Sequence, residues 1–194
     1  YGQNVNAGTV NMSGAVYLSE HLKANNIKTP IAYVGSHVQA LPIKALRDEP
    51  SIDFCFTNEG VYALRNILSL DKIDIHNMED IKGIVWRKDG KPTFNPSEAV
   101  VPRDRMDIDL PGYAWDLLPC KDKPLDLYRA PMWHAEYDET KRSPYAAIQT
   151  SLGCQFGCNF CMINILNRND EEEVGVAGNY SLMRHWSPEF IIKE

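Results

Sequence analysis

Three cysteines in the last quarter of the chain, Cys154, Cys158 and Cys161, form a CxxxCxxC pattern. Spacings of four and three residues let one loop bring three thiolates to a compact metal centre. Gly153 and Gly157 give that loop the backbone freedom it needs. Three ligands leave one coordination position open, whereas a structural zinc site is normally closed by four protein ligands. The pattern therefore predicts a metal centre that can bind a small molecule.

The cysteine pattern is also compatible with two simpler roles. A zinc site could be completed by His134 or His185, although neither histidine lies at a motif-like spacing from the cysteines. Three incidental buried thiols are the second possibility, which the crowding of the cysteines disfavours. The chain has five cysteines in all, an odd number that fits a disulfide framework poorly. Cys55 lies in an apolar run typical of a core strand, and Cys120 lies in a proline-rich region that favours a loop.

The sequence around the cysteines resembles the cluster loop of the radical S-adenosylmethionine superfamily. A predicted strand leads into the loop, and Phe160 stands directly before the last cysteine. The resemblance implies that Cys154, Cys158 and Cys161 ligate a [4Fe–4S] cluster whose fourth iron binds S-adenosylmethionine, with Phe160 against the adenine. It also implies reductive cleavage of S-adenosylmethionine to a 5′-deoxyadenosyl radical, with electrons from an external donor of the flavodoxin or ferredoxin type.

A second resemblance covers the first third of the chain. Residues 34–42 (VGSHVQALP) and 52–60 (IDFCFTNEG) are similar to the second half of the cobalamin-binding domain that precedes many radical S-adenosylmethionine barrels. That family has a Gly-Gly-Pro-His turn and a Gly-Glu-Gly-Glu segment, each of which is only partly kept here. No Asp-x-His-x-x-Gly motif is present, so no lower ligand of cobalt is identified. The resemblance implies cobalamin contacts from Gly35, Ser36, His37 and Thr9.

Each of these cobalamin contacts also has an ordinary structural role open to it. His37 follows a predicted strand, at the edge where open α/β sheets bind ligands, but a loop histidine is an equal alternative. Gly35 could permit close approach of a cofactor or simply end the strand. Thr9 could line the same edge or start a helix. Glu59 and Gly60 could direct the amino end of a helix at a ligand, yet glutamate is common in a first helical turn.

Helical and strand patterns alternate over residues 1–75. We expect a helix from Ser13 to about Asn26, a strand over 31–34, a helix over 43–47, a strand over 52–56 and a helix after Gly60. Strands separated by helices of this length are typical of βαβ units in a parallel sheet. The sequence therefore predicts an α/β fold with a small Rossmann-like domain.

The chain changes character after residue 82. Asp89-Gly90 between two β-rich runs predicts a hairpin. Eight of the twelve prolines then lie between Pro92 and Pro144, which favours an irregular connector. Residues 145–150 read as a strand that opens into the cysteine loop, and Ser187-Pro188 begins a helix.

These patterns divide the chain into three parts. Residues 1–82 are predicted to be the end of a cobalamin-binding Rossmann-like domain, 83–143 a hairpin and proline-rich connector, and 144–194 the first strand, loop and helix of a partial TIM barrel. Because the chain lacks a starting methionine and its last predicted helix spans under two turns, we expect it to be part of a longer protein.

Composition excludes several classes of protein. The 194 residues are 44% hydrophobic and 24% charged, values of a globular protein and not of a disordered one. The net charge of −6 offers no basic excess for nucleic acid. The sequence has no apolar run long enough for a membrane helix and no visible secretory signal. We therefore expect a cytoplasmic protein without a nucleic-acid partner.

The sequence favours an enzyme of the cobalamin-dependent radical S-adenosylmethionine class. The resemblance implies methyl transfer to an unactivated carbon, or cyclisation or rearrangement there, on a small-molecule, cell-envelope or natural-product substrate. One alternative is a tRNA methylthiotransferase-like enzyme, a family that carries further cluster ligands in its first domain, where Cys55 and Cys120 are the available cysteines. The other is a non-catalytic zinc-binding module.

Overall fold

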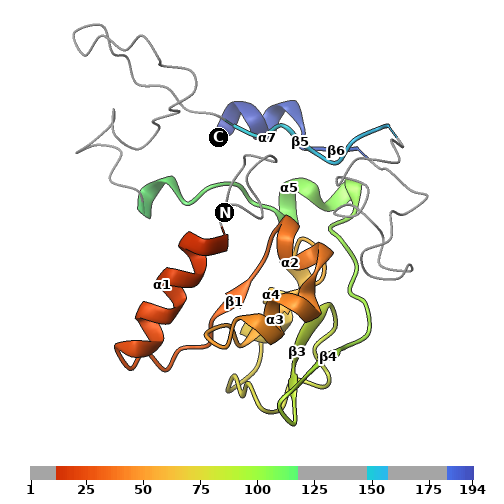
Figure 1. Cartoon of the computed structure of the whole chain (residues 1–194). Helices are drawn as coiled ribbons and strands as arrows, with labels where there is room; N and C mark the ends of the chain where they lie inside the picture. Colours follow the sequence, from red (N-terminus) through yellow and green to blue (C-terminus); the bar gives the residue numbers. More distant parts are fainter. Residues whose placement is uncertain (1–11, 118–147, 157–182) are drawn as a thin grey trace, which may run out of the picture.

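A four-stranded mixed sheet forms the centre of the computed structural model, which describes residues 12–117, 148–156 and 183–194 (Figure 1). The strands stand side by side in chain order. They are β1 (Ala32–Tyr33), β2 (Phe54–Phe56), β3 (Ile84–Lys88) and β4 (Lys91–Phe94). The first two strands are parallel, and the other pairs are antiparallel. The predicted α/β class is correct, and the predicted parallel pairing holds between β1 and β2.

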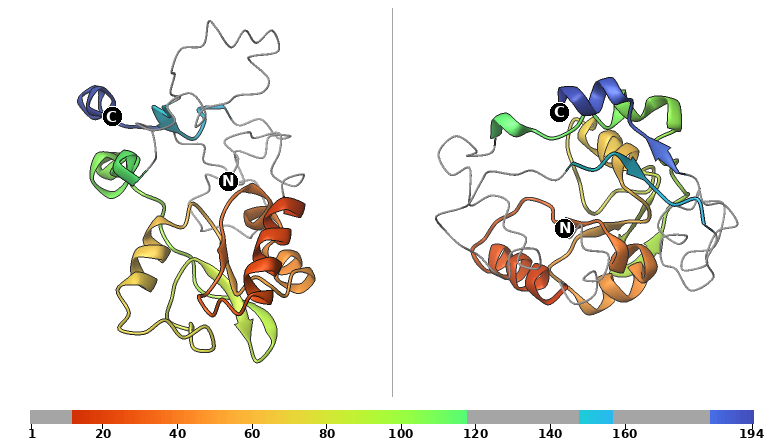
Figure 2. Two further views of the ribbon diagram at one scale, coloured as in Figure 1. Left: turned by 90° about the vertical axis from the view of Figure 1, so that its left-hand side faces the viewer. Right: turned by 90° about the horizontal axis from the view of Figure 1, so that it is seen from above.

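Helices cover both faces of this sheet, as the side view in Figure 2 shows. They are α1 (Met12–Ala24), α2 (Ser36–Ala40), α3 (Pro42–Asp48) and α4 (Val61–Leu68). The predicted helices correspond to α1, α3 and α4. Helix α2 was not predicted, because a five-residue helix directly after a strand has no helical periodicity to reveal it.

The alternation of side chains along the strands explains why both faces need cover. On β2, Phe54 and Phe56 pack with α4, whereas Cys55 between them packs on the other face with residues of α2 and α3. On β3, Ile84 and Trp86 join the first cluster and Val85 joins the second. Successive side chains of a strand point to opposite faces, so two apolar clusters sandwich the sheet.

The predicted hairpin is present as β3 and β4. Its turn residues Asp89 and Gly90 have φ values of 50° and 78°, the left-handed geometry that Asp-Gly favours in a two-residue hairpin turn. β3 also pairs with β2, so the hairpin that was expected to belong with the connector is continuous with the sheet. The division of the chain at residues 82 and 143 stays a prediction.

The connector and the chain after it add short elements beside the sheet. These are the 3₁₀ turns Arg103–Arg105 and Trp115–Leu117, α5 (Met106–Asp109), β5 (Ser151–Leu152), β6 (Arg184–His185) and α7 (Pro188–Lys193). β5 and β6 pair antiparallel. Of the strand expected over 145–150, residues 148–150 are not in a strand, and pairing begins at Ser151 because that is where β6 lies opposite.

The helix expected at Ser187 is present. The Ser187 hydroxyl accepts the backbone N–H of Phe190 at 3.1 Å, and Pro188 occupies the first helical position. Within the described part of the chain, no helix combines the length and apolar character needed to cross a bilayer.

Candidate functional site

The carboxyl end of β1 carries three of the residues singled out in the sequence. Gly35 has φ +127° and ψ 177°, a conformation that strains any residue with a Cβ, and no atom lies within 4 Å of where a Cβ would stand. Ser36 and His37 follow in the first turn of α2, and both are half-buried. The glycine therefore lets β1 turn directly into a helix while leaving open space beside the backbone.

Gly35, Ser36 and His37 line one pocket. The pocket has a volume of about 240 Å³ and lies between α1 and the segment 31–38. Its α1 wall is mainly apolar, with Leu18 and Leu22 among the lining residues. Three predicted cofactor contacts thus share one hollow that can take part of an amphipathic ligand.

A cluster of hydroxyl groups holds α1 against the sheet behind this pocket. The Ser19 hydroxyl lies 2.9 Å from the Tyr33 phenol oxygen and 2.7 Å from the Ser51 hydroxyl, and it donates to the Val16 carbonyl. Burial is the main cause that raises the pKa of Tyr33, so the phenol stays neutral. The cluster fixes the pocket wall without placing a charge in it.

The end of the neighbouring strand β2 lies at the same edge, because β1 and β2 are parallel. The Asn58 side chain accepts the Gly60 N–H at 2.9 Å and donates to the Glu98 carbonyl at 2.7 Å. Gln39 of α2 donates to the Asn58 carbonyl, which ties the two strand ends together. Hydrogen bonds therefore cross-link this edge, and the buried Thr57 hydroxyl beside them has no partner among the described residues.

Cys154 follows β5 in a loop whose geometry suits a metal ligand. Gly153 has φ +93°, the left-handed region that glycine adopts most easily, and Cys154 is half-buried. The backbone N–H of Phe156 points to the Cys154 sulfur at 3.5 Å. Such an N–H stabilises negative charge on sulfur, as hydrogen bonds do in iron–sulfur loops.

Cys55 has the opposite environment. Its side chain is fully buried in the cluster beneath α2 and α3, and burial raises the pKa of its thiol to about 12. A neutral thiol that is buried in an apolar cluster is a poor nucleophile, because the thiolate is the reactive species. The interpretation of Cys55 as a core residue is confirmed.

A buried ion pair joins β6, the partner of the strand that precedes Cys154, to the sheet edge. Arg184 of β6 binds the Glu59 carboxylate with both terminal nitrogens, at 3.1 and 2.7 Å. Glu59 follows β2, and α4 begins only at Val61, so Glu59 precedes the helix in whose first turn it was expected. The pair β5–β6 therefore sits at the carboxyl edge of the parallel strands, the end of the sheet that faces β5 in Figure 1.

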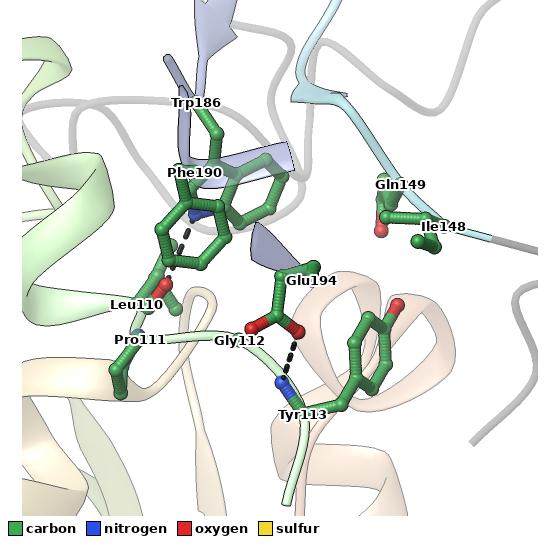
Figure 3. Close-up of a pocket in the computed structure, with 9 residues that line it drawn as sticks. All are labelled: Leu110, Pro111, Gly112, Tyr113, Ile148, Gln149, Trp186, Phe190 and Glu194. Atoms are coloured by element: carbon green, nitrogen blue, oxygen red, sulfur yellow. Dashed lines mark hydrogen bonds between the residues drawn. The ribbon is translucent and has the colours of Figure 1, made fainter. Parts of the chain in front are cut away.

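A second, smaller pocket lies at the other end of β5. It encloses about 130 Å³ between the connector and α7, with Trp186 and Phe190 stacked along its wall (Figure 3). Its carboxylate, Glu194, accepts the Tyr113 N–H at 3.0 Å and the Trp115 indole N–H at 3.1 Å. Ile148 and Gln149 line it before β5 begins, whereas Cys154 follows β5, so this pocket is separate from the cysteine loop.

Four predicted site residues, Thr9, Cys158, Phe160 and Cys161, lie outside the described residues. Among the residues that the structure does describe, no group of three or more His, Cys, Asp or Glu side chains is arranged to hold a metal ion. Thr57 and the pairing of Glu59 with Arg184 were not predicted, because single polar residues far apart in the chain carry no pattern. The sequence suggested Glu59 only as part of a helix start that could face a ligand.

Comparison with known proteins relates the chain to a protein named as a methyltransferase. The chain is 27% identical over 158 residues to an uncharacterized methyltransferase of Pyrococcus horikoshii. The matched region is 81% of this chain and 30% of the relative, so the chain spans about a third of that protein. No family model matches the chain. The match is a distant similarity to part of that protein.

Proposed function

We propose that this chain is part of a radical S-adenosylmethionine enzyme that also binds cobalamin and transfers a methyl group to an unactivated carbon. The observation that carries the proposal is the CxxxCxxC pattern, whose first cysteine is a partly exposed thiol directly after β5 and Gly153. The similarity to a protein named as a methyltransferase supports methyl transfer over the cyclisation and rearrangement that the sequence leaves open.

The residues present fit an iron–sulfur cluster. Cys154 is half-buried, follows a flexible glycine and accepts a backbone N–H, which are properties of a thiolate ligand. Cys158 and Cys161 would complete the set of three. When bound, the cluster would supply the electron that cleaves S-adenosylmethionine. In this proposal Cys154 would be the first cluster ligand, and Phe160 would contact the adenine of S-adenosylmethionine.

The sheet edge fits part of a corrinoid. Gly35 leaves open space beside its backbone, and Ser36 and His37 line the adjoining pocket. Glycine at this position would let the cofactor approach the backbone closely. The Ser36 hydroxyl and the His37 imidazole would bind its polar side chains, while the apolar wall of α1 would contact its apolar parts.

The burial of Cys55 weighs against the tRNA methylthiotransferase-like alternative. That family needs further cluster ligands in its first domain, and Cys55 is a buried core thiol. Only Cys120 then remains for such a site in residues 1–143. The substrate that we propose is therefore a small molecule, a cell-envelope component or a natural product, and the electron donor is a flavodoxin or ferredoxin.

Metal analysis tests the cluster. The chain is reconstituted anaerobically with iron and sulfide, and both elements are measured per chain alongside zinc. We expect about four irons and four sulfides per chain, with most of both lost in Cys154→Ala and kept in the matched variant Cys55→Ala. Stoichiometric zinc without sulfide would replace the proposal with the zinc-binding module.

A separate titration tests the corrinoid. Hydroxocobalamin binding is followed by its absorbance and by equilibrium dialysis in the wild type, Gly35→Ala and Gly90→Ala. Both glycines have positive φ and open space around them, but Gly90 lies in the hairpin turn. We expect binding to be weakened in Gly35→Ala alone. Equal binding by Gly35→Ala and the wild type would remove Gly35 from the site.

A further inference from the structure

The ion pair between Glu59 and Arg184 is a three-way joint. The Arg184 side chain is 3% exposed and the Glu59 side chain 18% exposed. Besides their two mutual contacts, Arg184 donates to the Val101 carbonyl at 2.6 Å, and Glu59 accepts the Val101 N–H. Val101 is itself fully buried. The joint thus connects the end of β2, the connector and β6, which are far apart in the sequence.

The joint lies close to Cys154 along the backbone. In the β5–β6 ladder, Arg184 stands opposite Leu152, and Cys154 is two residues beyond Leu152. Each of these strands has only two residues, so their mutual pairing is weak. Other hydrogen bonds of this segment go to the connector, among them those from Trp186 to Leu110 and from Ser187 to Asp107. Among these contacts, the Glu59–Arg184 pair alone reaches the loop directly after β2.

A buried ion pair of this kind fixes position more than it adds stability. Removing one partner leaves a buried charge without a counterion, while apolar residues of similar volume in place of both are often tolerated. The bidentate geometry also restricts the orientation of the guanidinium, because two parallel N–H···O contacts must form together. The Glu59–Arg184 pair can therefore hold β6 in one fixed position against the segment that follows β2.

We propose that Glu59 and Arg184 are positioning residues that hold the Cys154 loop at a fixed distance from the sheet edge formed by Gly35 and Thr57. The inference rests on the proposed function, in which that loop carries the cluster and that edge carries the corrinoid. When the ion pair is lost, β6 is no longer fixed to the sheet edge. Because β5 is paired with β6, β5 and Cys154 after it then become more mobile as well.

The distance between the loop and the sheet can be measured without any metal. Nitroxide labels are attached to Cys154 and to an introduced Lys44→Cys in the full chain, with Cys120, Cys158 and Cys161 replaced by serine. Lys44 lies in α3 with a side chain 55% exposed, and Cys55 is buried from the reagent. Double electron–electron resonance then gives the distribution of distances between the labels.

The matched control is the ion pair between Lys23 and Asp53. Its nitrogen–oxygen distance is 2.8 Å, the Asp53 side chain is 10% exposed, and Asp53 also accepts the backbone N–H of Ile31. It resembles the Glu59 pair in these respects, but its hydrogen bonds within the described chain join α1 to the sheet and do not reach β5 or β6. Asp53→Asn therefore measures the effect of losing a similar pair elsewhere.

We expect a single narrow distribution in the parent and in Asp53→Asn, and one about twofold broader in Glu59→Gln, because the short strand pair then opens locally. If Glu59→Gln does not fold, the same broadening of the distance distribution is expected in Arg184→Lys. Lysine keeps the positive charge of Arg184 but cannot make the bidentate contact. Identical distributions, or equal broadening in Asp53→Asn, would overturn the positioning role. The measurement uses no iron, so its failure is distinct from failure of the proposed function.

Discussion

The two cysteines within the described residues should differ sharply in reactivity, and the difference decides which of them can serve as a metal ligand. We consider a variant with Cys120, Cys158 and Cys161 replaced by serine, which leaves Cys55 and Cys154. Cys55 has no exposed surface, whereas Cys154 is half-buried. Only Cys154 should react with iodoacetamide in the folded chain.

The size of the effect follows from the pKa of Cys55. Burial raises it from 9.0 to about 12. Three units lower the thiolate fraction at neutral pH about 1000-fold, before any obstruction by the surrounding core is counted. Because the thiolate is the reactive species, the alkylation rate of Cys55 should fall steeply, although the greater nucleophilicity of a high-pKa thiolate offsets part of that factor. Below pH 12 the rate should rise about tenfold per pH unit.

Mass spectrometry after timed alkylation provides the assay. At about pH 7.5 the folded chain should gain one adduct, on Cys154, and urea should release a second site on Cys55. Adducts on both cysteines at comparable rates would refute the reasoning, because Cys55 would then be an accessible thiolate. That result would also return Cys55 to the set of possible cluster ligands and revive the methylthiotransferase-like alternative.

Three further predictions concern stability, each measured by urea unfolding. Gly60→Ala should lower the free energy of unfolding by about 2 kcal/mol, because Gly60 has φ +76° and an added Cβ would lie 2.8 Å from the Phe56 ring. An unchanged urea midpoint would contradict this prediction. Arg87→Met should lower the free energy of unfolding by about 2–3 kcal/mol, because the guanidinium donates to the carbonyls of Ile52, Leu46 and Glu49. A decrease of less than about 0.5 kcal/mol would contradict this prediction. Because the pKa of Cys55 is raised on folding, the stability that its neutral thiol contributes is fully present below about pH 9. That contribution is lost as the pH rises toward 12. Between about pH 8 and 10.5 the wild type should therefore lose about 2 kcal/mol more than Cys55→Ala, and equal losses would show that the thiol titrates normally.

Local signals in the sequence were sufficient for much of the fold. Asp89-Gly90 specifies its hairpin because both residues accept the left-handed backbone that the turn requires. Ser187 specifies the start of α7 because its side chain satisfies a free N–H of the first turn. In each case the cause lies within a few residues of the effect, so a single sequence reveals it.

Apart from the short helix α2, the features that were missed depend on distant partners. β5 begins at Ser151 because β6, more than thirty residues later, lies opposite it. The joint of Glu59 and Arg184 brings together residues that no local pattern relates. The antiparallel addition of β3 to β2 is set by burial of Val85 and Trp86 on opposite faces. Such pairings are decided by packing of the whole domain.

The candidate site divides in the same way. The sequence identified Gly35, Ser36 and His37, and the structure brings them into one pocket. It did not identify Thr57, because an unsatisfied hydroxyl is visible only when its surroundings are known. Cys154 was identified by its spacing from two other cysteines, and the structure adds its accessible position beside β5.

Electron paramagnetic resonance of the reduced, reconstituted chain, with and without S-adenosylmethionine, tests the central claim most directly. We predict a [4Fe–4S] signal whose g values shift when S-adenosylmethionine is added, and loss of that response in Cys154→Ala but not in Cys55→Ala. A wild-type spectrum without an iron–sulfur signal, or a Cys154→Ala chain that responds to S-adenosylmethionine as the wild type does, would contradict the account.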